Sequence, residues 1–339
     1  MRQVALTGPR SVELSEAPVP APSAGDVLVE VKATAICGTD VHIYAGDMPV
    51  AYPRVPGHEV AGVVQDVGAG VTSIASGDPV VINPNLNCNS CERCLVGKEN
   101  LCVKIQLMGR ETDGVLREYL TVPYTHAFKM PPHLSFAEGA LLQPLSTVVH
   151  AQRLADIRPT DSVVVVGQGA SGLMHTGLSK LAGAYPVIAV GRSQWKLDLA
   201  EQMLSDFTVR AGREDPVARV LELTGGHGAD VVIEAVGTPE TIQQALDMTK
   251  PGGRTVVFGI SSAPLPSLDL LRMYLGEKTL AFPRATTRAD FHRTVAIVAS
   301  KRLDLKPLIT QEYALEDAAS AFAFAEGEPS KVLRVVIRP

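Results

Sequence analysis

Two patterns of apolar positions divide the chain. Up to about residue 145, short apolar segments alternate with turns that contain Gly and Pro; examples are residues 27–32, 60–67 and 79–82. Short strands separated by such turns are typical of an antiparallel β domain. Further along, apolar runs alternate with stretches of helical spacing; the runs are residues 161–166, 187–190, 230–236, 254–260 and 279–282. This alternation predicts an α/β domain with a doubly wound parallel sheet.

The end of the chain departs from the α/β pattern. It contains two stretches of helical spacing, at residues 288–300 and 316–325, and a last apolar run at 332–337. We expect this segment to return to the first domain. The predicted organisation is therefore a discontinuous domain of residues 1–147 and 285–339, with an α/β domain of residues 148–284 inserted into it.

Composition narrows the functional classes. Of the 339 residues, 46% are hydrophobic and 20% charged, and the net charge is −5. This balance is ordinary for a globular protein and gives no electrostatic reason to expect a nucleic acid or an anionic membrane as partner. Neither a signal-peptide core nor an apolar run of about 18 residues is visible, so we expect a cytoplasmic protein. In that reducing compartment, closely spaced cysteines indicate metal binding rather than disulfides.

Four of the five cysteines form one cluster in the sequence. Cys88, Cys91, Cys94 and Cys102 have the spacing C-x2-C-x2-C-x7-C. Four buried thiols without a metal would be an improbable use of such regular spacing. Four thiolates close a tetrahedral shell around zinc and leave no position for a substrate. We therefore predict a structural zinc in a lobe of residues 86–104.

The fifth cysteine belongs to a second candidate metal site. Cys37 is followed by Thr39 and His42, and further on by the adjacent pair His58 and Glu59. Taken singly, these residues have plainer explanations: a buried thiol, a core histidine, a surface carboxylate. Together, one thiolate, one imidazole and one carboxylate leave a coordination position open, which is the arrangement of a catalytic zinc. The sequence thus predicts two zinc ions per subunit.

A glycine-rich turn marks a dinucleotide site. It follows the first apolar run of the α/β domain, opens a helical stretch, and comprises Gly167, Gly169, Ala170, Ser171 and Gly172. Such glycines are common in tight turns, but a strand before them and a helix after them are the context of a dinucleotide-binding motif. The backbone can then approach a pyrophosphate at the N-terminus of the helix.

The end of the second α/β strand indicates which dinucleotide. NAD sites place an acid there to bind the ribose 2′-hydroxyl. This chain has Gly191, Arg192 and Ser193 instead, with Lys196 close behind. These residues can bind a 2′-phosphate by charge-assisted hydrogen bonds, so NADP(H) is favoured over NAD(H). The alternative is that Arg192 and Lys196 are solvated side chains at the start of a helix.

These motifs together resemble the zinc-dependent medium-chain dehydrogenase/reductase superfamily, and within it the polyol (sorbitol-like) and threonine dehydrogenase branch. The resemblance spans nearly the whole chain and is carried by residues 37–42, 57–59, the cysteine lobe, 143–146, 167–172, 234–237 and 306–309. It implies a GroES-like antiparallel β catalytic domain followed by a Rossmann cofactor domain. It also implies that Cys37, His58 and Glu59 bind the catalytic zinc. Thr39 would link the substrate oxygen to the nicotinamide ribose, and His42 would carry the proton towards solvent.

One position departs from the branch. Gln143 stands before Pro144-Leu145-Ser146, where polyol dehydrogenases usually have Glu. A glutamine keeps its hydrogen-bonding groups but cannot ionise. We therefore do not expect residue 143 to act as a general base or as an exchanging metal ligand. With Cys37 and Glu59 both anionic, a neutral Gln143 leaves the metal a stronger Lewis acid than a second glutamate would.

The leading prediction is an oxidoreductase that interconverts a secondary alcohol and a ketone with NADP(H). A polyol, sugar or cyclitol is the expected substrate class, and a threonine-type amino-alcohol dehydrogenase is the alternative. From another class, the chain could be a catalytically silent relative that binds a cofactor or a nucleic acid; the complete Cys37, His58, Thr39 and His42 set and the acidic composition argue against this. The resemblance further implies a homotetramer or homodimer, joined partly through the edge strand of the cofactor domain.

Overall fold

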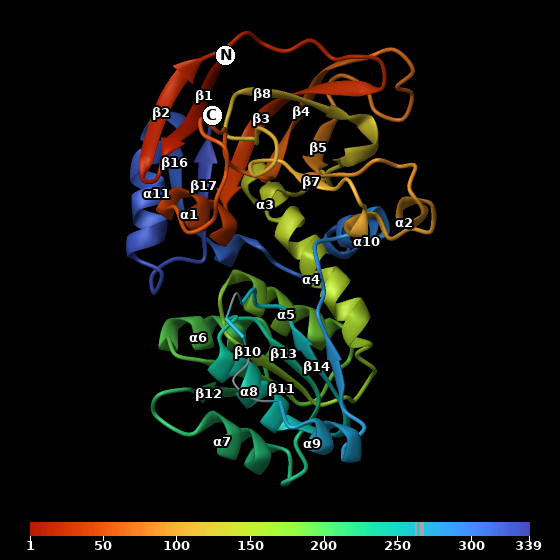
Figure 1. Cartoon of the computed structure of the whole chain (residues 1–339), viewed down its shortest axis with the longest axis vertical. Helices are drawn as coiled ribbons and strands as arrows, with labels where there is room; N and C mark the ends of the chain where they lie inside the picture. The colour runs from red at the N-terminus through yellow and green to blue at the C-terminus, as the bar shows by residue number, and fades with distance from the viewer. Residues whose placement is uncertain (262, 265–267) are drawn as a thin grey trace. The chain divides into compact units, whose positions relative to one another are not determined.

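The computed structural model describes residues 1–261, 263–264 and 268–339, which form two compact units (Figure 1). One unit consists of residues 1–146 and 286–339, and the other of residues 147–285. In the part of the chain that the structure describes, no helix combines the length and the apolar character needed to cross a bilayer.

The first unit is built on a seven-stranded sheet with the order β16-β17-β3-β4-β5-β9, in which β8 also pairs with β3. The strands are β3 (Asp26–Ile36), β4 (Glu59–Val67), β5 (Pro79–Ile82), β8 (Tyr119–Pro123), β9 (Ala127–Lys129), β16 (Ile309–Ala314) and β17 (Arg334–Arg338). Val27, Val29 and Val31 alternate with less buried residues, as expected of a strand with one face in a core.

The predicted antiparallel β domain is confirmed, and the C-terminal segment adds a parallel pair at one edge of its sheet. All the pairs are antiparallel except β16 with β17, which run parallel. Helix α11 (Ala318–Gly327) lies between these two strands in the chain. A helix between two paired strands takes the chain back to the end of the sheet where the first strand began, so the second strand runs in the same direction as the first.

Smaller elements complete the first unit. β1 (Arg2–Gly8) and β2 (Ser11–Glu16) form a hairpin, and β6 (Asn85–Leu86) pairs with β7 (Gln106–Leu107) on either side of the cysteine lobe. The helices are α1 (Gly38–Ala45), α2 (Glu92–Leu95), α3 (Phe136–Ala140), α10 (Arg288–Ala299) and α11. Helix α4 (Leu142–Ala155) continues from the first unit into the second.

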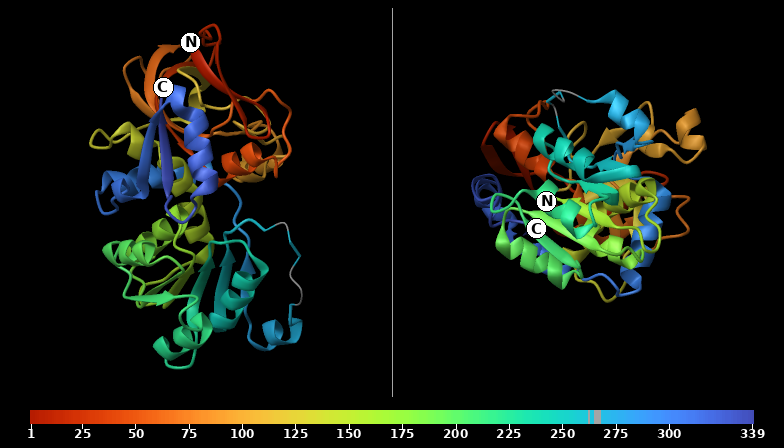
Figure 2. Two further views of the ribbon diagram at one scale, coloured as in Figure 1. Left: turned by 90° about the vertical axis from the view of Figure 1, so that its left-hand side faces the viewer. Right: turned by 90° about the horizontal axis from the view of Figure 1, so that it is seen from below.

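The second unit contains a six-stranded parallel sheet with the order β12-β11-β10-β13-β14-β15. Counted along the chain, this is the order 3-2-1-4-5-6 of a doubly wound dinucleotide-binding fold. The strands are β10 (Val163–Val166), β11 (Val187–Gly191), β12 (Phe207–Arg210), β13 (Ala229–Glu234), β14 (Thr249–Val257) and β15 (Thr279–Ala281). The helices are α5 (Ala170–Leu181), α6 (Gln194–Gln202), α7 (Pro216–Leu223), α8 (Pro239–Met248) and α9 (Leu270–Leu275); Figure 2 shows helices on both faces of the sheet.

The four consecutive valines of β10 explain its continuous apolar run. Val164 and Val166 belong to a core with Val220 of α7 and Ala245 of α8. The intervening Val163 and Val165 belong to a second core with Ala151 and Ala155 of α4. Both faces of the strand are therefore buried, as parallel sheets require.

Candidate active site

The second candidate metal site forms where β3 ends and β4 begins. Cys37 follows the last residue of β3 and caps α1, while Glu59 is the first residue of β4. The two strands pair with Ala35 opposite Glu59, which brings the ends together. The ligand atoms of Cys37, His58 and Glu59 all lie within 4.8 Å of one another. The residues predicted as ligands of a catalytic metal are thus close enough to share one ion.

Asp40 organises this cluster, although its role was not predicted. Its buried carboxylate accepts hydrogen bonds from the backbone N–H groups of Cys37 (2.9 Å) and Gly57 (3.0 Å). It also lies 3.5 Å from Nδ1 of His58. A carboxylate beside one ring nitrogen orients the other nitrogen for metal binding. The position of Asp40 three residues after Cys37, in the first turn of α1, was the available sequence signal.

Charges within the cluster shift two of its pKa values. Burial alone would lower the pKa of His58, but Asp40 and Cys37 outweigh burial and raise that pKa well above its ordinary value. Burial also raises the pKa of Glu59, against the opposing charges of Arg334 and His58. Neither carboxylate oxygen of Glu59 has a hydrogen-bond partner among the described residues, and both are buried. Arg334 Nε lies 3.2 Å from one of these oxygens but without hydrogen-bond geometry, so a metal cation at this position would supply the partner that both buried acceptors lack.

Thr39 and His42 both lie on α1, directly after the metal cluster. Their spacing of three residues places them on one side of the helix. Thr39 is half-buried, whereas the His42 side chain is 63% exposed and lies 3.6 Å from Asp47. A partly buried hydroxyl and an exposed imidazole are thus available in the order that a path to solvent requires.

Gln143 lies buried in the first turn of α4. The backbone carbonyl oxygen of Gln143 accepts a hydrogen bond from Oγ of Ser146 at 2.6 Å. A neutral side chain at this position adds no further buried acid to the unit, which already contains Asp40, Glu59 and Asp290.

The four cysteines of the lobe converge as predicted for a closed site. Neighbouring sulfurs are 3.5 to 4.0 Å apart, far longer than a disulfide bond. A tetrahedron with zinc–sulfur bonds of about 2.3 Å has edges of about 3.8 Å. The sulfurs therefore already have the separation that a tetrathiolate zinc demands.

Backbone groups also favour a thiolate within the lobe. The pKa of Cys88 is lowered to about 5, first by a hydrogen bond from the backbone of Ser90. Burial and neighbouring sulfurs raise the pKa of Cys94 to about 12. A metal ion removes this conflict, because every coordinating sulfur is then a thiolate.

The absence of a side chain has a different consequence at each glycine of the dinucleotide motif. Gly167 has φ +95°, a conformation that L side chains rarely adopt. A Cβ on Gly172 would lie 1.8 Å from the carbonyl oxygen of Gly167, so only glycine permits this approach of helix to strand. A Cβ on Gly169 would meet nothing within 4 Å, which leaves open space before Ala170 and Ser171 at the N-terminus of α5. This combination fits a bound pyrophosphate.

The residues predicted to bind a 2′-phosphate lie at the carboxyl end of β11. Gly191 ends that strand, and Ser193 is the N-cap of α6 without a side-chain cap hydrogen bond. Arg192 is exposed and forms no ion pair with any residue that the structure describes. Lys196 is partly buried, and burial lowers its pKa. The exposed guanidinium and the uncapped helix start therefore offer hydrogen-bond donors for an anion.

Glu234 fixes the loop that follows β13. One carboxylate oxygen accepts hydrogen bonds from the backbone N–H groups of Val236 and Gly237 and from Oγ1 of Thr241, each at 2.8 Å. Its carbonyl oxygen accepts from the N–H groups of Phe258 and Gly259. The loops after β13 and β14 are thereby tied together at the carboxyl edge, where doubly wound folds bind ligands.

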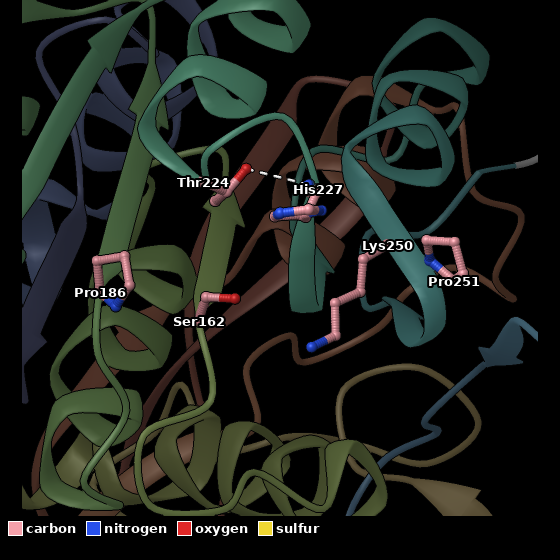
Figure 3. A pocket seen from close by; sticks show the side chains of 7 residues that line it. Ser162, Pro186, Thr224, His227, Lys250 and Pro251 are labelled. Atoms are coloured by element: carbon pink, nitrogen blue, oxygen red, sulfur yellow. Dashed lines mark hydrogen bonds between the residues drawn. The ribbon is translucent and has the colours of Figure 1, made fainter.

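A cavity of about 480 Å³ lies at the opposite, amino-terminal edge of the same sheet (Figure 3). Ser162, His227 and Lys250 are among the residues that line it. Ser162 donates a hydrogen bond to Asp230, and Lys250 forms an ion pair with the same carboxylate. The charge of Lys250 is thus already balanced, and this cavity lies away from the residues predicted to bind the dinucleotide.

Comparison with known proteins agrees with this geometry. Residues 23–132 match the family described as Alcohol dehydrogenase GroES-like domain, and residues 170–300 match that described as Zinc-binding dehydrogenase. The chain is 34% identical over 331 residues to L-threonine 3-dehydrogenase of Bacillus subtilis (95% of this chain, 94% of the relative). It is also 34% identical over 327 residues to a probable D-xylulose reductase A of Emericella nidulans (94% and 91%).

Solved structures match over the whole chain. Alcohol dehydrogenase TADH from Thermus sp. ATN1 has a TM-score of 0.94 at 31% identity and covers 100% of this chain and 99% of its own. A zinc-binding dehydrogenase from Sinorhizobium meliloti 1021, bound to NADP, has a TM-score of 0.93 at 29% identity with the same coverage. A short chain alcohol dehydrogenase from Escherichia coli CFT073, complexed with NADH, has a TM-score of 0.94 at 27% identity, again with 100% and 99% coverage.

Proposed function

Because the chain belongs to the zinc-dependent medium-chain dehydrogenase/reductase superfamily, in its polyol and threonine dehydrogenase branch, it is an enzyme that acts on CH–OH donors, and we propose that it interconverts a secondary alcohol and a ketone with NADP(H). The observation that carries the proposal is the convergence of Cys37, His58 and Glu59 within 4.8 Å, directly before the helix that contains Thr39 and His42. A polyol, sugar or cyclitol is the proposed substrate class.

Cys37, His58 and Glu59 would hold the catalytic zinc, and the four lobe cysteines a second, structural zinc. When bound, the catalytic zinc polarises an alcohol oxygen, and the nicotinamide accepts or donates the hydride. The protein's part is to orient the reactants and to move the proton. Asp40 holds His58 in place, and the Thr39 hydroxyl accepts the proton of the substrate oxygen while it releases its own proton towards His42, whose exposed imidazole exchanges it with solvent.

The cofactor would lie across the carboxyl edge of the parallel sheet. Gly167, Gly169 and Gly172 admit the pyrophosphate at the start of α5, and Arg192, Ser193 and Lys196 bind the 2′-phosphate of NADP(H). The exposed, unpaired Arg192 and the missing acid at Gly191 support NADP(H) over NAD(H).

The proposal is tested by following NADPH oxidation with a panel of ketones and ketoses, with and without a chelator. Turnover that the chelator abolishes and added zinc restores is the expected result. NADPH binding without turnover on any substrate would instead favour a silent cofactor-binding relative.

A threonine-type amino-alcohol dehydrogenase is the second candidate, because relatives of both kinds are 34% identical to the chain. Oxidation of threonine, polyols and aminocyclitols, compared by kcat/KM, separates the two. The lack of an ionisable group at Gln143 bears on both, since neither reaction can use that residue as a base.

We also propose that the protein assembles as a homotetramer or homodimer in the cytoplasm. β15 is an edge strand of the sheet, and α9 directly precedes it in the chain; Leu270, Leu271, Tyr274 and Leu275 of this helix are each at least 65% exposed. An apolar helix face beside an open sheet edge is typical of a subunit contact. Light scattering after size exclusion gives the assembly state, and a monomer would contradict this proposal.

A further inference from the structure

Arg334 is the charged residue of the metal cluster that the proposed function does not use. It is the first residue of β17, which pairs with β3 so that Val335 lies opposite Ile36. The strand on the other side of β3 is β4, which places Glu59 opposite Ala35. Two strands that follow each other in the sequence and a third from the far end of the chain thus bring Arg334, Cys37 and Glu59 to one end of the sheet.

The contact between Arg334 and Glu59 is electrostatic rather than a well-formed hydrogen bond. Nε of Arg334 lies 3.2 Å from Oε2 of Glu59, and the two side chains are 11% and 0% exposed. Among the described residues, neither Nε of Arg334 nor either oxygen of Glu59 has a partner with hydrogen-bond geometry. An arginine guanidinium is always charged in proteins, so Arg334 places a fixed positive charge directly beside Glu59.

Arg334 balances the formal charge of the metal site. A loaded site would contain the thiolate of Cys37 and the carboxylates of Glu59 and Asp40, and the two charges of zinc and the one of Arg334 balance these three. Without Arg334, the loaded site would carry one net negative charge and the metal-free site would have no permanent cation. Charges in a buried site interact strongly, because solvent screens them little.

We propose that Arg334 is a positioning residue that serves as the permanent counter-charge of the metal site, holds Glu59 in the metal-free protein, and competes with zinc for that carboxylate. The inference rests on the proposed function, in that it takes Cys37, His58 and Glu59 to bind zinc. Arg334 thereby weakens metal binding while it stabilises the empty site.

The test compares the wild type with Arg334→Met, which removes the charge at similar length, and with Arg334→Lys, which keeps it. Two readouts are needed: the release of zinc from zinc-replete protein to a colorimetric chelator, and the Tm of replete and metal-free protein. Arg334→Met should slow zinc release from the Cys37 site by on the order of tenfold or more and lower the Tm of the metal-free form more than that of the replete form. Arg334→Lys should behave like the wild type, and release from the cysteine lobe, an internal reference, should not change.

Equal losses of Tm in both forms with unchanged zinc release would show that Arg334 only packs the strand ends, and faster release would also overturn the inference. If Arg334→Met does not fold, the double variant Arg334→Met with Glu59→Gln, which removes one charge of each sign, should fold; its failure would exclude a charge-balancing role. A wild type that binds only the lobe zinc would instead refute the proposed function itself.

Discussion

At the scale of single residues, the proposed chemistry depends on two side chains of α1. Thr39 and His42 lie on one side of this helix, next to the metal cluster, and only His42 is well exposed. A hydroxyl and an imidazole in this order can pass a proton from a substrate to solvent. Neither residue is a predicted metal ligand, so their substitution should separate proton transfer from metal binding.

Thr39→Val should lower kcat by on the order of a hundredfold or more, because it removes the hydroxyl with little change in volume. His42→Gln should slow turnover less and change its pH profile, since water can replace an exposed proton acceptor. Steady-state kinetics across pH measures both effects, and zinc content and NADPH affinity serve as controls. Near-normal turnover of Thr39→Val would contradict the relay.

Cofactor choice is the second question that single residues decide. A charge-assisted hydrogen bond contributes about 1.5 to 3 kcal/mol, or roughly ten- to a hundredfold in affinity. The wild type should therefore prefer NADP(H) over NAD(H) by at least about tenfold in kcat/KM, and Arg192→Ala should remove most of this preference. Arg213→Ala, at another exposed arginine of the same unit, is the matched control. Equal use of both cofactors by the wild type would show that Arg192 is merely solvated.

Adding Gly191→Asp to Arg192→Ala should favour NAD(H) by supplying a ribose acceptor. The structure shows a limit to this design. A Cβ on Gly191 would approach Leu197 to 3.2 Å and Gln168 to 3.3 Å, so both side chains must shift slightly. The double variant should accordingly lose some stability while its cofactor preference changes.

At the scale of elements, we expect the cysteine lobe to contribute mainly to stability and the β3–α1–β4 junction mainly to catalysis. The lobe has little core of its own, because Leu95, Val96 and Val103 are exposed, so its order depends on the metal. The junction is instead part of the main sheet and stays folded through its strand pairs.

Cys94→Ser should therefore lower the Tm, by roughly 10 °C if several kcal/mol of metal-linked stability are lost. Cys37→Ser should abolish turnover with a much smaller change in Tm. Elemental analysis should find close to two zinc ions per wild-type subunit and about one in each variant. If Cys37→Ser lowered the Tm as much as Cys94→Ser, this division of roles would be wrong.

At the scale of the whole molecule, a buried histidine in the second unit should make stability depend on pH. His175 of α5 is fully buried, and burial lowers its pKa to about 3. Its Nε2 has no hydrogen-bond partner among the described residues, while Nδ1 lies 3.2 Å from Nε2 of Gln152. The unfolded chain binds a proton at this residue below about pH 6.5, but the folded protein does not until about pH 3.

The unfolding free energy should therefore fall as the pH drops below about 6.5, by about 1.4 kcal/mol per pH unit from this residue. His175→Gln should flatten this dependence between pH 6.5 and 4.5, even if it is less stable at pH 7.5. His133→Gln, at an exposed histidine, is the matched control and should keep the wild-type slope. Urea unfolding across this range measures it, and equal slopes for wild type and His175→Gln would contradict the prediction.

Local patterns in the sequence were sufficient to predict much of the fold. The four valines of β10, the glycines after them and the helix to Leu181 depend on interactions between residues that are close in the sequence. All three of these predictions are confirmed. The same holds for the α/β fold with its GroES-like and Rossmann domains, which the comparisons also support. β12 and α7 were not predicted, because Phe207–Arg210 is only partly buried and its apolar pattern is correspondingly weak.

The cysteine spacing and the Cys37, His58 and Glu59 set are likewise visible in the sequence, since metal ligands must be of a few residue types. What only the tertiary structure decided is which distant groups join them. Arg334 is separated from Glu59 by most of the chain, and they become neighbours only because β17 and β4 both pair with β3. The parallel pair of β16 and β17 has the same origin, because strand pairing depends on how the whole chain returns to the sheet rather than on either segment. Local chemistry thus determined the candidate ligands, and long-range packing determined their charge balance.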